Sequence, residues 1–399
     1  MSSSGTVHEA LGACAGCRRR SWLLSALSVS LDFQAQDRAR LDELLSLDDR
    51  DLLRSLGGRR QSELGARYEA LSTEQIAEAP GVEAVCRHHS LYPRALRDDP
   101  ASPWMLHVAG GRRRLALLAG APVVAITGSR RASDYGVEMA HTLARGLAAS
   151  GVTVICELAD GIASAALAGA LEAGGPALAL PGNGLGVRWP TTKRPLYASL
   201  LRSGCALSEL PHDCRGRRWG AVAGDDALAR LAGLVVVVEA EEKPAQMALA
   251  RAVGARGKTV AAMPGRLTSP LSSGTHALLV DGARLVRGAQ DVLDLLYPLA
   301  PARRSSRSAV AEPGIPGLEP MLARILALVG TGRDTPDRLI EPGEDPAKAL
   351  LALSELELMG LLGRGAGGRY VPRHPAWALE GAAGTHAVPD TLTAATQGI

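Results

Sequence analysis

Aromatic residues are scarce in this chain of 399 residues, which has 5 tryptophans, 6 tyrosines and 1 phenylalanine. Base recognition by serial stacking needs several aromatic platforms, so this mode is disfavoured, and only Trp104, Trp189 and Trp219 remain as single candidates. A strong excess of one charge is also lacking, because 44 basic and 41 acidic side chains leave a formal net charge of +3. Any anion-binding site must therefore be local rather than a property of the whole surface.

Long apolar runs are missing as well. No window approaches the length of a membrane-spanning helix, and the start of the chain lacks the charged-then-apolar order of a secretory signal. We therefore expect no membrane association and a cytoplasmic location. The apolar content of 46% is enough for a full core, and the length favours two or three domains.

Cysteines are too few for a disulfide framework, since six are spread over the chain. Cys14 and Cys17 form a single C-x-x-C motif. A zinc site needs two further ligands, and no second pair at a suitable spacing follows. The pattern therefore favours free thiols near a mobile terminus, and no metal site is predicted.

Catalytic signatures are absent too. The sequence contains no H-E-x-x-H and no G-x-S-x-G motif, and no G-x-G-x-x-G follows its first buried strand. Glu157, Asp160 and Glu239 end predicted strands without an evident base or nucleophile partner, and Glu239 is interpreted by default as a helix-capping acid at a sheet edge. We therefore predict a protein that is not an enzyme and needs no cofactor.

Short β-branched runs alternate with helical stretches over residues 122–297. Strands that are buried on both faces, joined by crossover helices, produce this alternation. The sequence therefore predicts an α/β fold with a Rossmann-like, doubly wound and mainly parallel sheet. The predicted strands are "PVVAIT", "VTVIC", "ALAL", "CALS", "LVVVVEA" and "TVAAM".

Two smaller modules flank this core. Leucines at helical spacing predict an N-terminal helical module, and three helical units followed by a glycine-rich turn and a short strand pair predict a C-terminal winged helix. Glu355 and Glu357 oppose Lys348 there, so this module is expected to contact protein rather than phosphate. The predicted division is a helical (SAM/HhH-like) module at 1–78, the core at 88–298, a linker at 299–317, the winged helix at 318–373 and a flexible tail at 374–399.

Small residues and arginines follow the predicted strands at their carboxyl ends. Ligands of open parallel sheets bind at that edge, where helix N-termini point bare N–H groups outward. Gly128 permits a tight turn and a close phosphate approach, Ser129 can cap or donate, and Arg130 can grip a phosphate. The alternative is a plain strand-to-helix turn with two solvated arginines, and both interpretations stay open. The loops at 180–186 and 263–283 add small residues to the same edge.

These motifs together resemble the DprA/Smf family of DNA-processing proteins. "AITGSRRASDYG" resembles the family's G-S-R-x-x-S-x-Y-G loop, "ALSELP" its S-E-x-P turn, and "MPGRLTSPLSSGTHALLVDGA" its P-G-x-x-x-x-P-x-S-x-G-T-N-x-L-I-x-D-G-A segment. "SLYPRALRDDPASPWMLHVAGG" is similar to its Y-P-x-x-L entry segment, and "LADGIASAALAGALEAGG" to the helix after its S-G-x-A-x-G-I-D motif. The helical module before the core and the winged helix after it also match the family's layout.

The resemblance implies a protein that binds single-stranded DNA and loads a RecA-type recombinase in natural transformation, and that forms a homodimer through the sheet domain. It places Gly128, Ser129, Arg130 and Ser133 in the strand-binding pocket, with the loop around Gly265 and Gly274 beside it. The full set of predicted DNA- and phosphate-binding residues is Gly128, Ser129, Arg130, Arg131, Ser133, Gly161, Gly182, Gly265, Ser273, Gly274 and Thr275.

The chain departs from the family where its basic R-N-R motif is expected. Gly224, Asp225 and Asp226 stand there, and removing two phosphate contacts while adding repulsion weakens strand binding. Arg215, Arg217 and Arg218, just upstream, are candidates for compensation or else a solvated basic run. Two alternatives therefore stay open: a protein-interaction scaffold with weak or lost DNA binding, and, less favoured, a Rossmann-type phosphoribohydrolase, whose P-G-G-x-G-T-x-x-E motif is not matched.

Overall fold

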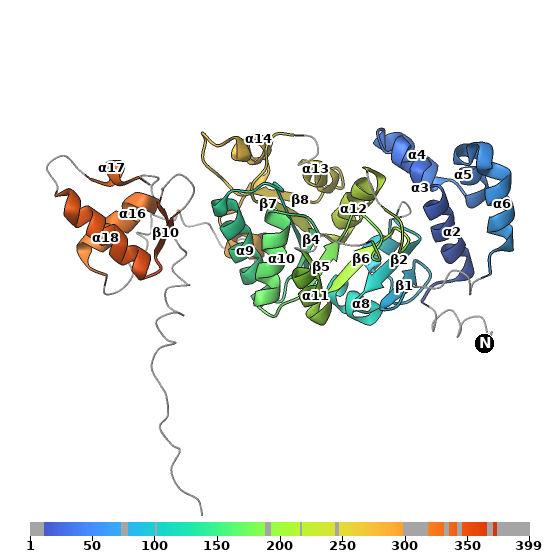
Figure 1. Cartoon of the computed structure of the whole chain (residues 1–399), viewed down its shortest axis with the longest axis horizontal. Coiled ribbons are helices and arrows are strands. Elements are labelled where there is room, and N and C mark those ends of the chain that lie inside the picture. Colours follow the sequence, from blue (N-terminus) through green and yellow to red (C-terminus); the bar gives the residue numbers. More distant parts are fainter. Residues whose placement is uncertain are drawn as a thin grey trace, which may run out of the picture. The chain divides into compact units, whose positions relative to one another are not determined.

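The computed structural model of the chain describes residues 12–72, 79–99, 102–187, 193–215, 218–243, 247–297, 318–330, 335–340, 345–364 and 370–372 (Figure 1). Two compact units divide the chain, residues 1–300 and 301–399. The predicted linker at 299–317 and the predicted tail at 374–399 lie outside the described residues.

The first unit is built on one sheet, whose strand order within the described residues is β1-β2-β6-β5-β4-β3-β7-β8-β9. Strands β3 to β9 run parallel, whereas β2 pairs antiparallel with β6 and β1 antiparallel with β2. The prediction of a doubly wound, mainly parallel sheet is therefore confirmed. The strands are β1 Val82–Cys86, β2 Met105–Ala109, β3 Val123–Thr127, β4 Thr153–Glu157, β5 Ala177–Leu180, β6 Cys205–Ser208, β7 Leu234–Val237, β8 Thr259–Ala262 and β9 Arg284–Leu285.

Helices cover both faces of this sheet, which is why its central strands are apolar along their whole length. One core lies between the sheet and α9 (Asp134–Ala149), α10 (Ile162–Glu172), α11 (Arg194–Ser203) and α15 (Ala289–Leu296). The other lies between the sheet and α7 (Arg94–Arg97), α8 (Arg112–Gly120), α12 (Arg218–Leu231) and α13 (Ala248–Gly254). Helix α14 (Ser273–Val280) follows β8.

The order of the strands creates a switch point between β3 and β7. From β3 the chain steps outward through β4, β5 and β6, and then returns to the opposite side of β3 to add β7, β8 and β9. The crevice outside the carboxyl ends of the strands at such a switch point is the common ligand position in open α/β sheets. The loops after β3 and β7 therefore border this crevice.

Residues 12–72 form the predicted helical module, drawn in blue in Figure 1. Aspartates cap two of its helices, since Asp37 accepts the Arg40 N–H and Asp48 accepts the Asp51 N–H. The leucine core of the module continues into the sheet domain through Trp219 of α12, which is buried. The helices are α2 Ala15–Ala26, α3 Ser28–Gln34, α4 Arg38–Ser46, α5 Asp49–Leu56 and α6 Gln61–Ala70, with a 3-10 turn at Gly58–Arg60.

The second unit contains three helices and a two-stranded antiparallel sheet in its described residues. They are α16 Pro320–Gly330, α17 Pro336–Leu339, α18 Pro346–Leu358, β10 Leu362–Arg364 and β11 Tyr370–Pro372. A cluster that includes Ile325, Leu339, Leu353 and Leu362 holds them together. The element order agrees with the predicted one, and the assignment as a winged helix stays a prediction.

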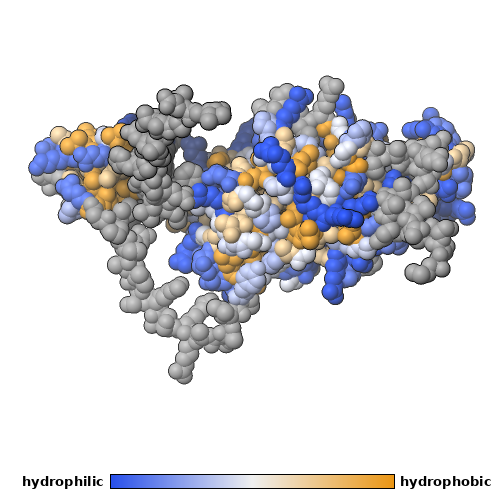
Figure 2. Space-filling view, turned by 90° about the horizontal axis from the view of Figure 1, so that it is seen from below, coloured by the Kyte–Doolittle hydropathy of each residue, from blue (hydrophilic) through white to orange (hydrophobic). Residues whose placement is uncertain are grey.

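Figure 2 shows hydrophilic and hydrophobic residues interspersed over the face that it draws. Among the described residues, no helix has both the length and the apolar character needed to cross a bilayer.

Candidate nucleic-acid interface

The loop after β3 runs directly over the end of β7. The Ser129 N–H donates to the Glu239 carbonyl at 2.6 Å, and the Val238 N–H donates to the Thr127 carbonyl at 3.1 Å. A Cβ at residue 128 would lie 2.4 Å from the Glu239 carbonyl oxygen. Gly128 is thus required by the close approach of two backbones at the switch point, before any ligand is considered.

The Glu239 carboxylate lies at the N-terminus of α9. Its Oε2 accepts the Ser133 N–H at 2.8 Å, and its Oε1 accepts the Ser133 hydroxyl at 2.7 Å. Ser133 is the N-cap of α9, because its Oγ accepts the Gly136 N–H at 3.1 Å. The interpretation of Glu239 as a helix-capping acid is confirmed, and this buried carboxylate takes an anion position that a helix N-terminus favours.

Gly161, in the loop after β4, supports the same turn. Its φ of +71° is left-handed, and a Cβ there would meet the Ser129 carbonyl oxygen at 2.2 Å. The Ile162 N–H donates to that carbonyl at 3.1 Å, while the buried Ser129 hydroxyl accepts the Arg131 N–H at 3.1 Å. The small residues of the motif therefore fix the shape of the loop and leave its arginines to face outward.

Arg130 and Arg131 are both exposed at this edge. The Arg130 side chain is 71% exposed, and its Nη2 lies 3.6 Å from Oε2 of Glu157, the last residue of β4. An exposed pair at this distance contributes little to stability. The Arg130 guanidinium therefore stays available to solvent and to a ligand, with a carboxylate beside it.

Asp225 extends this group of charges from α12. Burial, the charge of Glu157 and a hydrogen bond with Glu157 raise the pKa of the Asp225 carboxyl well above its ordinary value. Arg130, Glu157 and Asp225 thus form one contiguous charged group at the carboxyl edge of β4. Because a hydrogen bond between two carboxyl groups needs one proton, Asp225 and Glu157 together carry about one negative charge beside Arg130.

Asp226 belongs to a different environment, although it is the next residue in the sequence. It is buried and pairs with Arg256 at 3.0 Å, with Arg230 at 3.8 Å and with Arg38. The sequence placed both acids at the position of the family's basic motif. The structure turns Asp226 away from the edge, because neighbouring residues of a helix point in directions about 100° apart.

The loop after β8 packs beside the end of β7. The Gly274 N–H donates to the Ala240 carbonyl at 2.9 Å, and a Cβ at residue 274 would meet the Glu241 carbonyl oxygen at 2.7 Å. The Ser273 Oγ accepts the Glu242 N–H at 3.1 Å. The loops after β3, β7 and β8 therefore form a continuous edge.

The remaining predicted residues have structural surroundings as well. A Cβ at residue 265 would meet the Ser272 Oγ at 2.1 Å, so Gly265 closes the β8 loop on itself. The buried Thr275 hydroxyl donates to the Ser272 carbonyl at 3.0 Å. Gly182 follows β5 and lies against α12, where a Cβ at Gly220 would meet its carbonyl oxygen at 2.0 Å.

Further cations lie near these loops. Arg215 and Arg218 are exposed before and at the start of α12, whereas Arg217 lies outside the described residues. Sequence analysis missed Lys193, whose Nζ lies 2.5 Å from Asp160 Oδ1 and donates to the Ser164 Oγ at 2.8 Å. Lys193 precedes α11 on the crossover from β5 to β6, and this position in the sequence could have indicated a cation near the carboxyl edge of the sheet. The edge carries both signs of charge.

These features define a class: a Rossmann-like α/β protein whose glycine-rich switch-point loops present exposed arginines. The family described as DNA recombination-mediator protein A matches residues 83–297. The putative DNA processing protein DprA of Mycobacterium tuberculosis is 30% identical over 79% of this chain and 77% of its own length. The chain belongs to this DprA family.

Other relatives agree. Protein Smf of Escherichia coli is 30% identical over 73% of this chain and 78% of its own length. The X-ray structure of DprA from Streptococcus pneumoniae is similar with a TM-score of 0.56 and 26% identity, and it covers 69% of this chain and 95% of that chain. The resemblance seen in the sequence is therefore confirmed.

Proposed function

We propose that this protein binds single-stranded DNA along the carboxyl edge of β3, β4, β7 and β8, and hands the strand to a RecA-type recombinase in transformation or recombination. The observation that carries the proposal is the exposed Arg130 guanidinium on a rigid glycine-rich turn at the switch point. Membership of a DNA recombination-mediator family supports it. The role is one of binding rather than catalysis.

The arginine side chains of the turn, rather than its small residues, are available for a phosphate contact. Gly128 and Gly161 pack closely against neighbouring backbone, and the Ser133 hydroxyl is hydrogen-bonded to Glu239. Arg130 and Arg131 are the outward-facing cations of this loop. Guanidinium groups form strong, bidentate contacts with phosphate oxygens, so we assign the binding energy of the loop mainly to them.

A salt titration tests this proposal. Binding of a fluorescent poly-dT strand is measured at several salt concentrations for the wild type, Arg130→Ala and a control, Arg113→Ala. Arg113 is exposed on α8, whose end leads into the amino end of β3 and so lies at the opposite edge of the sheet. Loss of one phosphate contact lowers the slope of log affinity against log salt by about 0.7, and it weakens binding about fivefold at 0.1 M salt.

The control is expected to match the wild type in slope and affinity. Absence of wild-type binding at low salt would sink the proposal, and equal effects of Arg130→Ala and Arg113→Ala would place the strand elsewhere.

The handover and the predicted homodimer need separate measurements. Recombinase filament assembly on strands coated with single-strand-binding protein is expected to start faster when this protein is added, and Arg130→Ala is expected to reduce the effect. Sedimentation equilibrium of the full chain is expected to give a dimer mass. A monomer at micromolar concentration would contradict the second expectation alone.

A protein-interaction scaffold is the second candidate, and specific contacts favour it. Glu157 neighbours Arg130, Asp225 is hydrogen-bonded to Glu157, and Glu239 takes the anion position at α9. The negative charge that Glu157 and Asp225 share and the charge of the Glu239 carboxylate both oppose a polyanion. Retained recombinase binding in the absence of strand binding would support the scaffold over the primary proposal.

A further inference from the structure

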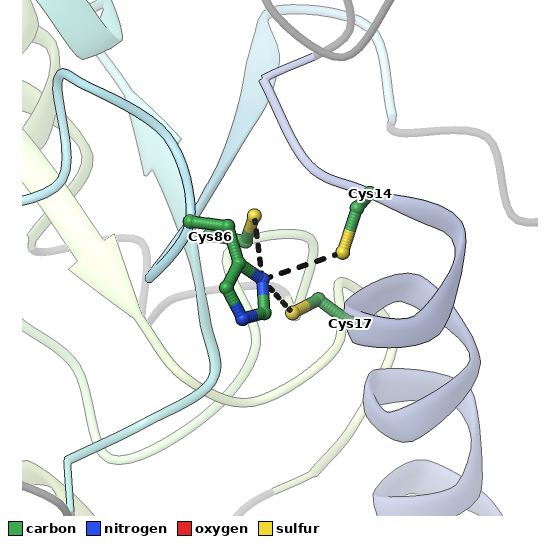
Figure 3. Close-up of side chains that lie close together, drawn as sticks. Cys14, Cys17 and Cys86 are labelled. Carbon is green, nitrogen blue, oxygen red and sulfur yellow. Dashed lines mark hydrogen bonds between the residues drawn. The ribbon is translucent and has the colours of Figure 1, made fainter. Parts of the chain in front are cut away.

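Three cysteines and one histidine from two distant segments meet at the junction between the helical module and the sheet. Cys14 is the N-cap of α2 and Cys17 lies in its first turn, whereas Cys86 ends β1 and His88 follows it two residues later. Figure 3 shows the three thiols directed at one imidazole ring. The sequence favoured free thiols because it offered no second pair, but the structure supplies the two missing donors.

The donor atoms have the spacing of a tetrahedral site. The His88 Nδ1 lies 3.5 Å from the Cys14 Sγ, 3.5 Å from the Cys17 Sγ and 3.9 Å from the Cys86 Sγ. All four donor atoms lie within 4.8 Å of one another. With Zn–S and Zn–N bonds of about 2.3 and 2.0 Å, a tetrahedron separates sulfur from nitrogen by roughly 3.5 Å and sulfur from sulfur by roughly 3.8 Å.

Backbone hydrogen bonds hold both segments in place independently of the thiol and imidazole side chains. The Cys86 N–H donates to the Gly12 carbonyl at 3.0 Å, and the Arg18 N–H donates to the Cys14 carbonyl at 3.1 Å. Gly12 has a φ of +77°, and a Cβ there would meet the Ala84 carbonyl oxygen at 2.1 Å. The loop before α2 is therefore docked tightly on β1, so the donors are preorganised.

We propose that Cys14, Cys17, Cys86 and His88 bind one zinc ion. The donor set is three thiolates and one imidazole nitrogen. Zn²⁺ binds such donors well, whereas hard cations prefer oxygen donors. Four protein donors leave no open coordination position, so the site is structural. An iron–sulfur cluster is disfavoured, because its cysteines bind different irons and lie farther apart than these donors.

The ion would clamp α2 to the edge strand β1. Cys17 and Cys86 are buried in a small cluster with Ala13, Ala84 and Met105. Three thiolates and one Zn²⁺ leave one negative charge. Trp104 packs against this cluster, and the Arg20 and Arg87 guanidinium groups stand 4.8 and 5.8 Å from its ring centre.

Metal analysis of the full chain, purified under reducing conditions, tests the proposal. We expect about one zinc per chain by mass spectrometry. Cys86→Ser and His88→Ala are expected to fall below about a tenth of that content. Cys205→Ser is the matched control, because Cys205 is a buried thiol on β6 outside the donor set. His88 is exposed, so its variant is expected to fold even where Cys86→Ser does not.

Cobalt replacement gives a second readout. Co²⁺ added to the chelated, reduced protein is expected to give the intense visible absorption of a tetrahedral thiolate site, and His88→Cys is expected to keep it with a shifted maximum. Zinc-free native protein that also gives no cobalt spectrum would overturn the proposal. So would equal zinc content in the wild type, Cys86→Ser and His88→Ala, or a disulfide between Cys14 and Cys17 in the native protein.

Discussion

Reversing the charge of Asp225 and of Asp226 in separate variants gives a sharp test of the candidate interface. The two acids are neighbours in α12, but their surroundings differ. Asp225 is hydrogen-bonded to Glu157, which lies beside the exposed Arg130. Asp226 is buried among Arg38, Arg230 and Arg256. The same substitution is therefore expected to change strand binding at one position and stability at the other.

Asp225→Arg removes the carboxyl that is hydrogen-bonded to Glu157 and adds a cation to the same group. One additional phosphate contact steepens the salt dependence by about 0.7 and tightens binding about fivefold at 0.1 M salt. Asp225→Asn replaces a carboxyl whose pKa is raised well above its ordinary value, so little negative charge is lost and an affinity and slope close to those of the wild type are expected. The poly-dT titration described above measures the affinity and the salt slope of both variants.

Asp226→Arg places a fourth guanidinium among three others in a site where the residue is 7% exposed. Breaking a buried ionic network in this way costs about 3–5 kcal/mol. Urea denaturation is expected to show this loss, whereas the folded fraction is expected to bind poly-dT with wild-type affinity. Tighter binding by Asp226→Arg with unchanged stability, or no gain from Asp225→Arg, would refute the assignment of the two faces of α12.

Two further predictions concern stability. Burial and the charge of Asp226 raise the pKa of Glu209 from 4.5 to about 7, against the opposing effect of Arg230. The stabilising contribution of the protonated Glu209 is complete below pH 4.5 and is lost as the pH rises to about 7. Glu209→Gln is therefore expected to remove roughly 3 kcal/mol of pH dependence from urea unfolding between pH 5 and 8. An unchanged pH profile would contradict this. Gly136→Ala is expected to cost about 1–3 kcal/mol, because its Cβ would lie 2.5 Å from Glu239 Oε2, whereas Gly224→Ala in α12 meets nothing within 4 Å and is expected to be neutral or stabilising in thermal unfolding.

The central strands could be predicted from the sequence because both of their faces are buried. Each of the six apolar runs matches one observed strand, from β3 to β8, although β4 extends one residue beyond its run to Glu157. The edge of the sheet was missed. Val82–Cys86 forms β1 between the predicted helical module at 1–78 and the predicted core at 88–298, and it was missed because Val82 is only partly buried and Glu83 is exposed, which leaves little apolar pattern. Edge strands receive weaker patterning than central ones.

The charged and metal-binding groups depend on contacts that no local pattern contains. Asp226 finds Arg38 and Arg256 on other elements, so its separation from Asp225 could not be obtained by counting along the chain. The Cys14 and Cys17 pair is completed by Cys86 and His88 only because the loop at Gly12 docks on β1. The glycine-rich loop was predicted at the correct edge, but the Glu239 carboxylate that holds it makes most of the loop structural.

The structural role of the loop and its binding capacity are therefore separable. Gly128, Ser133 and Gly136 all contact Glu239. Substitutions at these positions therefore alter the turn and the loops that pack against it. Within the described part of the chain, the Arg130 side chain pairs with Glu157 across an exposed 3.6 Å contact, so its removal is expected to leave the turn intact. Loss of strand binding in Arg130→Ala without loss of stability would locate the ligand contact in the side chain. Loss of both only in the glycine variants would mean that the motif maintains the fold and that the strand binds elsewhere.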